Sequence, residues 1–263
     1  GGLIELIRNA GLGRRLVGLS LDDQRLLVDL FTKSAADYLD QWFENSHVKA
    51  AFAFDGIVGA YASPQTPGTA YVLLHHCFGE VNGKRGQWGH AIGGMGAISE
   101  ALAAEARRLG VEIECNAAVA QVRPGAVALE DGRELFGRAI VANVNPKLLF
   151  LKMVDASLLE HDFRERIERY KCASATFRMN VALSALPRFA CLPEPGPHHA
   201  SGIIMAPSLG YMERAYLDAR AEGMARAPIV EMVIPSTLDD TLAPKGAHVA
   251  SLFCQHFDYT LPD

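Results

Sequence analysis

The feature that most constrains this chain is a run of glycines that leads into a long amphipathic segment. Gly93, Gly94 and Gly96 precede the segment, and Gly110 follows it. Apolar residues recur between them at helical spacing, and two arginines occupy the last turn, where the helix dipole favours cations. Glycine commonly ends a helix because it adopts positive φ without steric cost. The pattern predicts a tight turn followed by a helix that ends at Gly110.

The same glycines raise the question of a phosphate-binding loop. A dinucleotide-binding fingerprint needs a strand, then G-x-G-x-x-G in the turn, then a helix whose first N–H groups meet the pyrophosphate. Here the spacing is G-G-x-G, and the preceding GKRGQWGHAI has no strand character. The fingerprint is therefore not matched, and on local grounds a sharp turn is favoured over a ligand-binding role.

Composition and charge exclude several classes of function. The 263 residues are 49% hydrophobic and carry a formal net charge of −5, which gives no electrostatic reason to bind nucleic acid. Five scattered cysteines without a C-x-x-C pair fit a reducing cytoplasm better than a disulfide framework. The longest apolar region is interrupted by Asp55 and is shorter than the roughly 20 residues that a spanning helix needs. We expect a cytoplasmic protein without a transmembrane helix.

The first part of the chain, residues 1–87, is mostly helical in pattern. Ser20 and Asp23 predict a capped helix start. The segment before the glycine run, GEVNGKRGQWG, has the composition of a polar loop. The helices expected here are 20–42, 47–60 and 70–78.

The rest of the chain alternates strand and helix patterns. Asn145 followed by Pro146 predicts a capped helix, and Ser208 opens another. The strands expected are 111–115, 117–122, 126–132, 138–144, 174–183, 201–206, 228–235 and 247–257, with a polar helix near 161–170. This order differs from repeated βαβ units. The fold class predicted is α/β (mixed α+β).

One of these strands alternates strictly between apolar and polar residues. Phe177 and Met179 belong to its apolar face, and Arg178 and Asn180 to its polar face. Alternation with period two indicates a strand whose faces meet different surroundings. We expect the apolar face to pack and the polar face to meet water or a cavity.

Taken in order, these motifs resemble the phytoene-desaturase-like branch of the FAD-dependent amine oxidase superfamily. The similarity covers nearly the whole chain and is strongest from about Trp88 to Val154. The segments that carry it are GGMGAISEALAAEARRLGVEIECNAAVAQV, EDGRELFGRAIVANVNPKLLFLKMV, SATFRMNVAL and MVIPSTLDDTLAPKGAHVASLFCQHF. The resemblance implies a helical substrate-domain or lid segment at 1–87, a partial FAD-binding-domain element at 88–145, and a substrate domain with a mixed sheet at 146–263.

The resemblance also implies which residues contact FAD. Val119 would offer backbone groups to the adenine, which needs no particular side chain, and Asn143 would lie on a strand near the flavin nucleotide. The glycine run would lie beside the flavin, so its candidate cofactor-binding residues are Gly93, Gly94 and Met95.

Two pieces of the family pattern do not occur in this chain. The N-terminal G-x-G-x-x-G with its ribose-binding acid and the C-terminal flavin cradle are both missing, the first residue is not Met, and the chain stops after a strand-like run. We expect a central fragment of a longer protein, which by itself binds FAD weakly or not at all and is inactive.

The function implied is the substrate-binding portion of an FAD-dependent oxidoreductase, a dehydrogenase or desaturase, that acts on an apolar or amine-like substrate. In such enzymes the flavin accepts the hydride equivalent, and the protein orients the substrate and excludes water. The alternative is a non-catalytic domain of the same architecture that binds an apolar ligand or a partner. No catalytic residue can be named from the sequence.

Several side chains near the glycine run have simpler explanations than a role at the flavin. Trp88 fits as a packing residue, His90 as a cap on a neighbouring carbonyl, and Met95 as a filler of a core gap. Arg178 fits an exposed salt bridge better than a contact to a charged ligand. These explanations are the favoured ones.

Metal and hydrolase chemistry find little support. The pairs His75–His76 and His198–His199 are adjacent, so their side chains diverge and do not readily chelate one ion. Neither H-E-x-x-H nor G-x-S-x-G occurs. We expect no metal site and no nucleic-acid partner. A fragment would expose apolar surface, for which a homodimer and a peripheral membrane contact both remain open.

Overall fold

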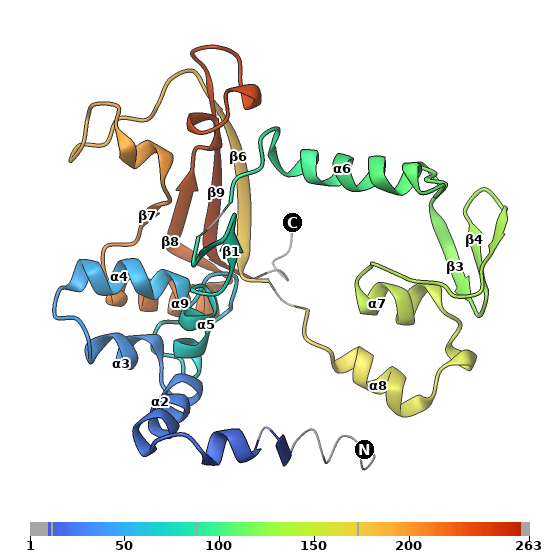
Figure 1. Cartoon of the computed structure of the whole chain (residues 1–263), viewed down its shortest axis with the longest axis horizontal. Coiled ribbons are helices and arrows are strands. Elements are labelled where there is room, and N and C mark those ends of the chain that lie inside the picture. The colour runs from blue at the N-terminus through green and yellow to red at the C-terminus, as the bar shows by residue number, and fades with distance from the viewer. Residues whose placement is uncertain (1–9, 12, 88, 173, 259–263) are drawn as a thin grey trace. The chain divides into compact units, whose positions relative to one another are not determined.

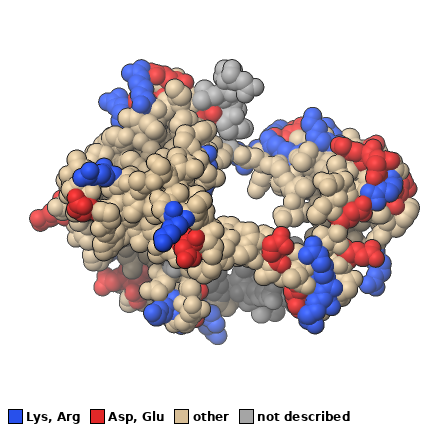
Figure 2. Space-filling view, turned by 90° about the horizontal axis from the view of Figure 1, so that it is seen from above, with Lys and Arg blue, Asp and Glu red and all other residues tan. Residues whose placement is uncertain are grey.

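The computed structural model describes residues 10–11, 13–87, 89–172 and 174–258. The chain divides into a larger unit, Gly1–Ala97 with Ala173–Asp263, and a smaller unit, Ile98–Cys172. Both contain helices and strands (Figure 1), which confirms the predicted mixed α/β class. Acidic and basic side chains are intermixed on the face of each unit seen in Figure 2. Among the described residues, no helix combines the length and apolarity needed to cross a membrane.

The larger unit begins with a layer of short helices. The first predicted helix, 20–42, is wrong in its extent, because it is interrupted at Lys33, whose backbone is extended. Ser34 then caps a second helix, accepting a hydrogen bond from the Asp37 amide at 3.0 Å, so a second cap restarts the helix. The helices are α2 (Leu21–Thr32), α3 (Ala35–Asp40), α4 (Ser46–Asp55) and α5 (Thr69–His75).

The segment predicted as a polar loop is instead a small hairpin. Strands β1 (Glu80–Val81) and β2 (Lys84–Arg85) pair across Asn82 and Gly83, which both have positive φ. An Asn-Gly pair is the residue combination that a two-residue hairpin turn favours. The sequence therefore carried the signal for this turn.

A four-stranded antiparallel sheet forms the other layer of the larger unit, in the order β6-β9-β8-β7 (Figure 1). Helix α9 (Leu209–Glu222) connects β7 to β8 and begins after Ser208, its cap, as predicted. Gly223 follows it at positive φ. The strands are β6 (Thr176–Leu183), β7 (Ile203–Met205), β8 (Met224–Val233) and β9 (His248–Phe257). Short 3₁₀ turns lie at Pro197–Ala200, Pro235–Thr237 and Asp240–Leu242.

The helices pack on one face of this sheet, which we call the covered face. Ile229 lies there, fully buried, in one core cluster with Phe54 of α4 and Met212 of α9. Residues paired across strands point to the same side of a sheet, so the register places further residues beside Ile229. By register the covered face consists of Thr176, Arg178, Asn180, Ala182, Ile204, Ile229, Glu231, Val233, Val249, Ser251, Phe253 and Gln255.

The opposite face, which we call the open face, has no helical layer over it in the described part of the larger unit. Its residues by register are Phe177, Met179, Val181, Leu183, Ile203, Met205, Val230, Met232, His248, Ala250, Leu252 and Cys254. Phe177 and Met179 remain 47% and 44% exposed. The expectation that the apolar face of this strand packs is therefore wrong for these two residues, because the helices cover the other face.

The smaller unit contains most of α6 (Gly94–Arg108) and a separate sheet. Gly110 follows α6 at positive φ, as predicted. The sheet of the smaller unit has three antiparallel strands, which are neighbours in the order of the sequence: β3 (Val119–Arg123), β4 (Ala126–Leu129) and β5 (Glu134–Phe136). Asn145 caps the helix that follows by accepting from the Lys147 amide at 2.9 Å. The remaining helices are α7 (Pro146–Leu148), a π-helical turn at Leu149–Met153, a 3₁₀ turn at Ala156–Leu158 and α8 (His161–Arg169).

Two predicted strands of the smaller unit do not form. Residues 111–115 and 138–144 have no regular structure, although their apolar patterns favour strands. A strand needs a hydrogen-bonded neighbour, and no described strand pairs with either segment. Val141 is consequently 94% exposed. That residues 88–145 belong to an FAD-binding domain stays a prediction.

Candidate functional site

The glycine run is held by a buried carboxylate that the sequence analysis missed. The Gly93 amide donates to Asp239 Oδ2 at 2.6 Å, and Asp239 Oδ1 accepts from the Thr241 hydroxyl and amide at 2.6 and 3.0 Å. The hydrogen bond from the Thr241 hydroxyl, followed by that from the Gly93 amide, lowers the pKa of Asp239, and nearby His90 lowers it further. The signal was an acid pair, Asp239–Asp240, in the turn-rich segment that follows the apolar strand β8.

This anchoring shows what the two glycines do locally. Gly93 and Gly94 have φ values of +88° and +75°, which only glycine adopts readily. The Gly94 amide donates to the Ala91 carbonyl at 2.9 Å, so the amides of both glycines are engaged within the chain. The arrangement agrees with a sharp turn into α6.

A hollow of about 360 Å³ lies next to this loop within the larger unit. His90 lines it on one side, and Ser201, whose hydroxyl donates to the His198 carbonyl at 3.1 Å, lines it on another. The other lining residues are Gly89, Ala200, Gly202, Val233, Ile234, Pro235 and Leu238. With one polar group already engaged and mostly small or apolar walls, the hollow suits a small, weakly polar group.

The other residues near the glycine run are placed as follows. Met95 is 79% exposed in the first turn of α6, so the expectation that it fills a core gap is wrong. Trp88 lies outside the described residues. Arg178 lies on the covered face with its guanidinium 5.6 Å from the centre of the Phe253 ring. No described carboxylate lies within ion-pair distance of Arg178, so the expected salt bridge is replaced by a cation–π contact.

A cluster of charged groups at the covered face was also missed. Burial raises the pKa of the Glu231 carboxyl, and Asp55 raises it further, while Arg178 and His76 lower it. Burial raises the pKa of Asp55 as well, against the opposite effect of His76. Both acids interrupt apolar runs, AFAFDGIV and PIVEMVIP, which is the signal that could have found them. Two such carboxyls can hold a proton that an exposed acid would lose.

Val119 and Asn143, the two candidate FAD contacts of the smaller unit, lie in different kinds of structure. Val119 is the first residue of β3, half-buried, and pairs with Leu129 of β4. Asn143 is exposed and lies in the segment without regular structure. Their role at FAD stays a prediction.

In each pair of adjacent histidines, the two rings contact each other. His199 Nε2 lies 2.9 Å from the Pro187 carbonyl. The rings of His198 and His199 lie 4.0 Å apart and are tilted by 43°, so the expectation that these adjacent side chains diverge is wrong. The rings of His75 and His76 meet edge to face. Within the described ranges, no three His, Cys, Asp or Glu side chains come together as metal ligands.

Comparison with known proteins places this arrangement in a family. Residues 18–178 match the family described as flavin containing amine oxidoreductase. A rat protein, pyridine nucleotide-disulfide oxidoreductase domain-containing protein 2, is 37% identical over 245 residues, which cover 89% of this chain and 42% of that protein. Chloroplastic prolycopene isomerase of Arabidopsis thaliana is 26% identical over 75% of this chain and 30% of its own length.

The fold also resembles that of a protein crystallised from Pyrococcus furiosus. The TM-score is 0.51, with 13% identity, over 85% of this chain and 50% of that one; at this identity the likeness concerns the fold alone. The chain spans less than half the length of the curated relatives it matches. The resemblance found in the sequence is thus confirmed at the level of the family, since the matched region covers more than half of the chain. The chain belongs to the flavin containing amine oxidoreductase family.

Proposed function

We propose that this chain is the substrate-binding portion of an FAD-dependent dehydrogenase or desaturase, and that the open face of the four-stranded sheet is its substrate wall. The observation that carries the proposal is the composition of that face, in which every residue except His248, opposite Leu183 at one end of the sheet, is apolar. An exposed apolar surface of this kind on a folded unit marks a place where something else binds.

The substrate class follows from the same face. It offers hydrocarbon and sulfur atoms and no charged group, so it suits a substrate without charge at the bound segment. The Arabidopsis relative is named for prolycopene, which supports an apolar polyene over an amine. The wall would orient such a chain by shape and would exclude water from the reacting C–H bond.

FAD would be held mainly by groups of the smaller unit. When bound, the flavin supplies the acceptor for the hydride equivalent. The chain's own contribution would be the Val119 backbone and the Asn143 amide. The unpaired strand-like segments 111–115 and 138–144 support this, because they have the pattern of strands that further segments of a longer protein would pair. The engaged amides of Gly93 and Gly94 suggest that these glycines shape the loop, with Met95 left exposed beside it.

The alternative is a non-catalytic domain that binds an apolar ligand on the same face. The visible absorption spectrum of the whole protein distinguishes the two functions. We expect a yellow protein whose flavin absorbance at about 450 nm is bleached by an apolar donor under anaerobic conditions. A colourless whole protein that binds apolar ligands would support the alternative instead.

A pair of variants tests the assignment of the flavin contacts. Asn143→Leu removes a polar side chain and should lower flavin occupancy, whereas Val119→Ala should leave it unchanged, because a main-chain contact survives truncation of the side chain. Occupancy is measured as the ratio of flavin to protein absorbance. Equal loss in both variants, or in neither, would contradict the assignment.

A further inference from the structure

A pocket of about 430 Å³, which we call the end pocket, lies where β6 finishes and β9 begins (Figure 1). Its wall consists of the segments 185–188 and 193–195 after β6, His199, and Gly246 and His248 at the start of β9. By register His248 also belongs to the open face, where it is the one polar residue. The end pocket and the proposed substrate wall therefore share this side chain.

The hydrogen bonds around His248 indicate which ring nitrogen carries its proton. Nδ1 lies 3.3 Å from Ser236 Oγ, and the Val249 amide donates to the same oxygen at 3.1 Å. Because Ser236 Oγ accepts from the amide, its own proton can go to Nδ1, which leaves the proton of the neutral imidazole on Nε2. Among the described residues, Nε2 has no hydrogen-bond partner. His248 thus offers an N–H donor at the end of the apolar wall.

The other polar side chains of the end pocket already have partners. His199 Nε2 lies 2.9 Å from the Pro187 carbonyl, and its Nδ1 lies 3.3 Å from the Gly196 amide nitrogen. Arg188 and Glu194, the two charged residues of the wall, have opposite charges and approach to 3.9 Å. Because these charges offset each other, the pocket does not favour an ion of either sign. It suits an uncharged oxygen that accepts one hydrogen bond.

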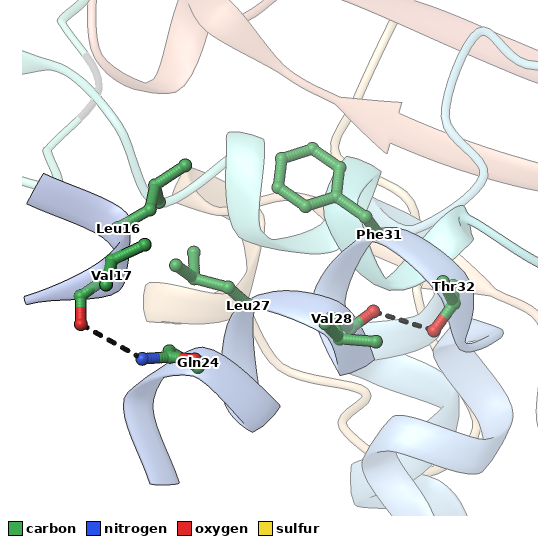
Figure 3. A pocket seen from close by; sticks show the side chains of 7 residues that line it. All are labelled: Leu16, Val17, Gln24, Leu27, Val28, Phe31 and Thr32. Carbon is green, nitrogen blue, oxygen red and sulfur yellow. Dashed lines mark hydrogen bonds between the residues drawn. The ribbon is translucent and has the colours of Figure 1, made fainter. Parts of the chain in front are cut away.

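A larger groove beside α2 differs from the end pocket in its hydrogen bonding. This groove encloses about 450 Å³ (Figure 3), and its side-chain donors belong to Gln24 and Thr32. Gln24 Nε2 donates to the Val17 and Leu19 carbonyls at 3.4 and 3.0 Å. The Thr32 hydroxyl donates to the Val28 carbonyl at 2.6 Å. The lining side chains of this groove thus have no donor left for an occupant, whereas the end pocket has one.

We propose that the end pocket binds a hydroxyl group at one end of a linear apolar substrate, with His248 Nε2 donating to the hydroxyl oxygen. From Cys254 to His248 the strand β9 runs about 20 Å, so a chain lying along the open face reaches this donor. A substrate without the oxygen leaves the N–H unpaired and binds less tightly. Ser236 is a positioning residue that holds the ring and its tautomer. The inference rests on the proposed function, because it names the substrate class of the same face.

The test compares the affinity of the whole protein for all-trans-retinol, whose polyene ends in a hydroxyl, and for its deoxy analogue, the hydrocarbon of the same chain. Quenching of intrinsic fluorescence measures both. We expect His248→Phe to weaken binding of the alcohol about fivefold and to leave binding of the hydrocarbon unchanged, because the ring is kept and the donor is lost. His47→Phe is the matched control: it makes the same change at an exposed position in the first turn of α4 and should bind both ligands as the wild type does.

Two further variants keep the proposal testable if His248→Phe does not fold by circular dichroism. His248→Gln keeps an N–H donor near the position of Nε2 and should retain most of the affinity for the alcohol. Ser236→Ala removes the group that fixes the tautomer and should weaken binding of the alcohol alone.

Met179→Glu, on the open face, separates this inference from the proposed function. If it weakens binding of both ligands while His248→Phe weakens neither, or weakens both equally, the open face is the substrate wall and the inference about the end pocket is overturned. If neither ligand binds, or if Met179→Glu changes the affinity for neither, the proposed function falls and the inference falls with it.

Discussion

In the four-stranded sheet, the polar residues are distributed between the two faces in the reverse of the usual way for an antiparallel sheet with one face in water. The covered face carries Arg178, Glu231 and Gln255, whereas the open face is apolar except for His248 at one end. An antiparallel sheet with one solvated face usually puts its polar residues toward water. Here the helices cover the mixed face and leave the apolar one. The difference supports the proposal that the open face meets an apolar occupant.

The largest expected effect is a difference in the free energy of unfolding between substitutions on the two faces. Ile229→Ala on the covered face should lower the free energy of unfolding by about 3 kcal/mol, because it opens a cavity at a fully buried site. Met179→Ala on the open face should cost less than about 1 kcal/mol, since its side chain is half exposed. Urea unfolding of both variants measures the difference. Similar costs would mean that the open face is packed as a core.

A smaller effect is expected from the polar link between the covered face and the helices. Gln255 Nε2 donates to the Ile57 and Ala60 carbonyls at 3.0 and 3.2 Å, and its Oε1 accepts from the Gly59 amide at 3.2 Å. Gln255→Leu leaves these groups unpaired in a buried place and should cost about 2 kcal/mol.

The same substitution at Gln121 provides the control for this prediction. Gln121 belongs to β3, and no described hydrogen bond involves its side chain, so Gln121→Leu should change the free energy of unfolding by less than about 0.5 kcal/mol. If the two variants lose equal stability, Gln255 does not link sheet and helices as described.

The covered side also contains a titratable ring, His256, packed between Tyr61 and Tyr216. Burial lowers the pKa of His256 from 6.5 to about 4. The unfolded chain therefore binds this proton first as pH falls, and the stability that His256 contributes is lost below about pH 6.5, by about 2 kcal/mol between pH 7 and 5.

The readout is the difference in pH dependence between the wild type and His256→Phe. The raised pKa values of Asp55 and Glu231 act in the opposite sense, so the wild-type curve alone is not diagnostic. The free energy of unfolding is measured for both proteins at pH 5, 6 and 7. Between pH 7 and 5 the wild type should lose about 2 kcal/mol more than His256→Phe does. Parallel curves would show that His256 is not neutral and buried.

Local signals in the sequence predicted much of this fold. Caps at Ser20, Asn145 and Ser208 and the terminal glycine Gly110 marked helix ends correctly, because capping depends on neighbouring residues alone. The second cap at Ser34 and the Asn-Gly turn were present in the sequence and overlooked.

What could not be predicted depends on partners distant in the sequence. Residues 111–115 and 138–144 have strand patterns, but a strand forms only where a neighbour pairs with it. Which face of β6 the helices cover is likewise decided by packing. For the same reason the hydrogen bond from Gly93 to Asp239, 146 positions apart, and the Asp55–Glu231 cluster emerged only from the structure.

The most direct test of the open face as a substrate wall is the affinity of the whole protein for a linear apolar polyene, measured by quenching of its intrinsic fluorescence. The comparison is between Met179→Glu, on the open face, and Leu217→Glu, at a similarly exposed position on α9. We predict that Met179→Glu weakens binding at least about tenfold, because a carboxylate replaces an apolar contact, and that Leu217→Glu binds as the wild type does. Equal affinity in the two variants would contradict the account.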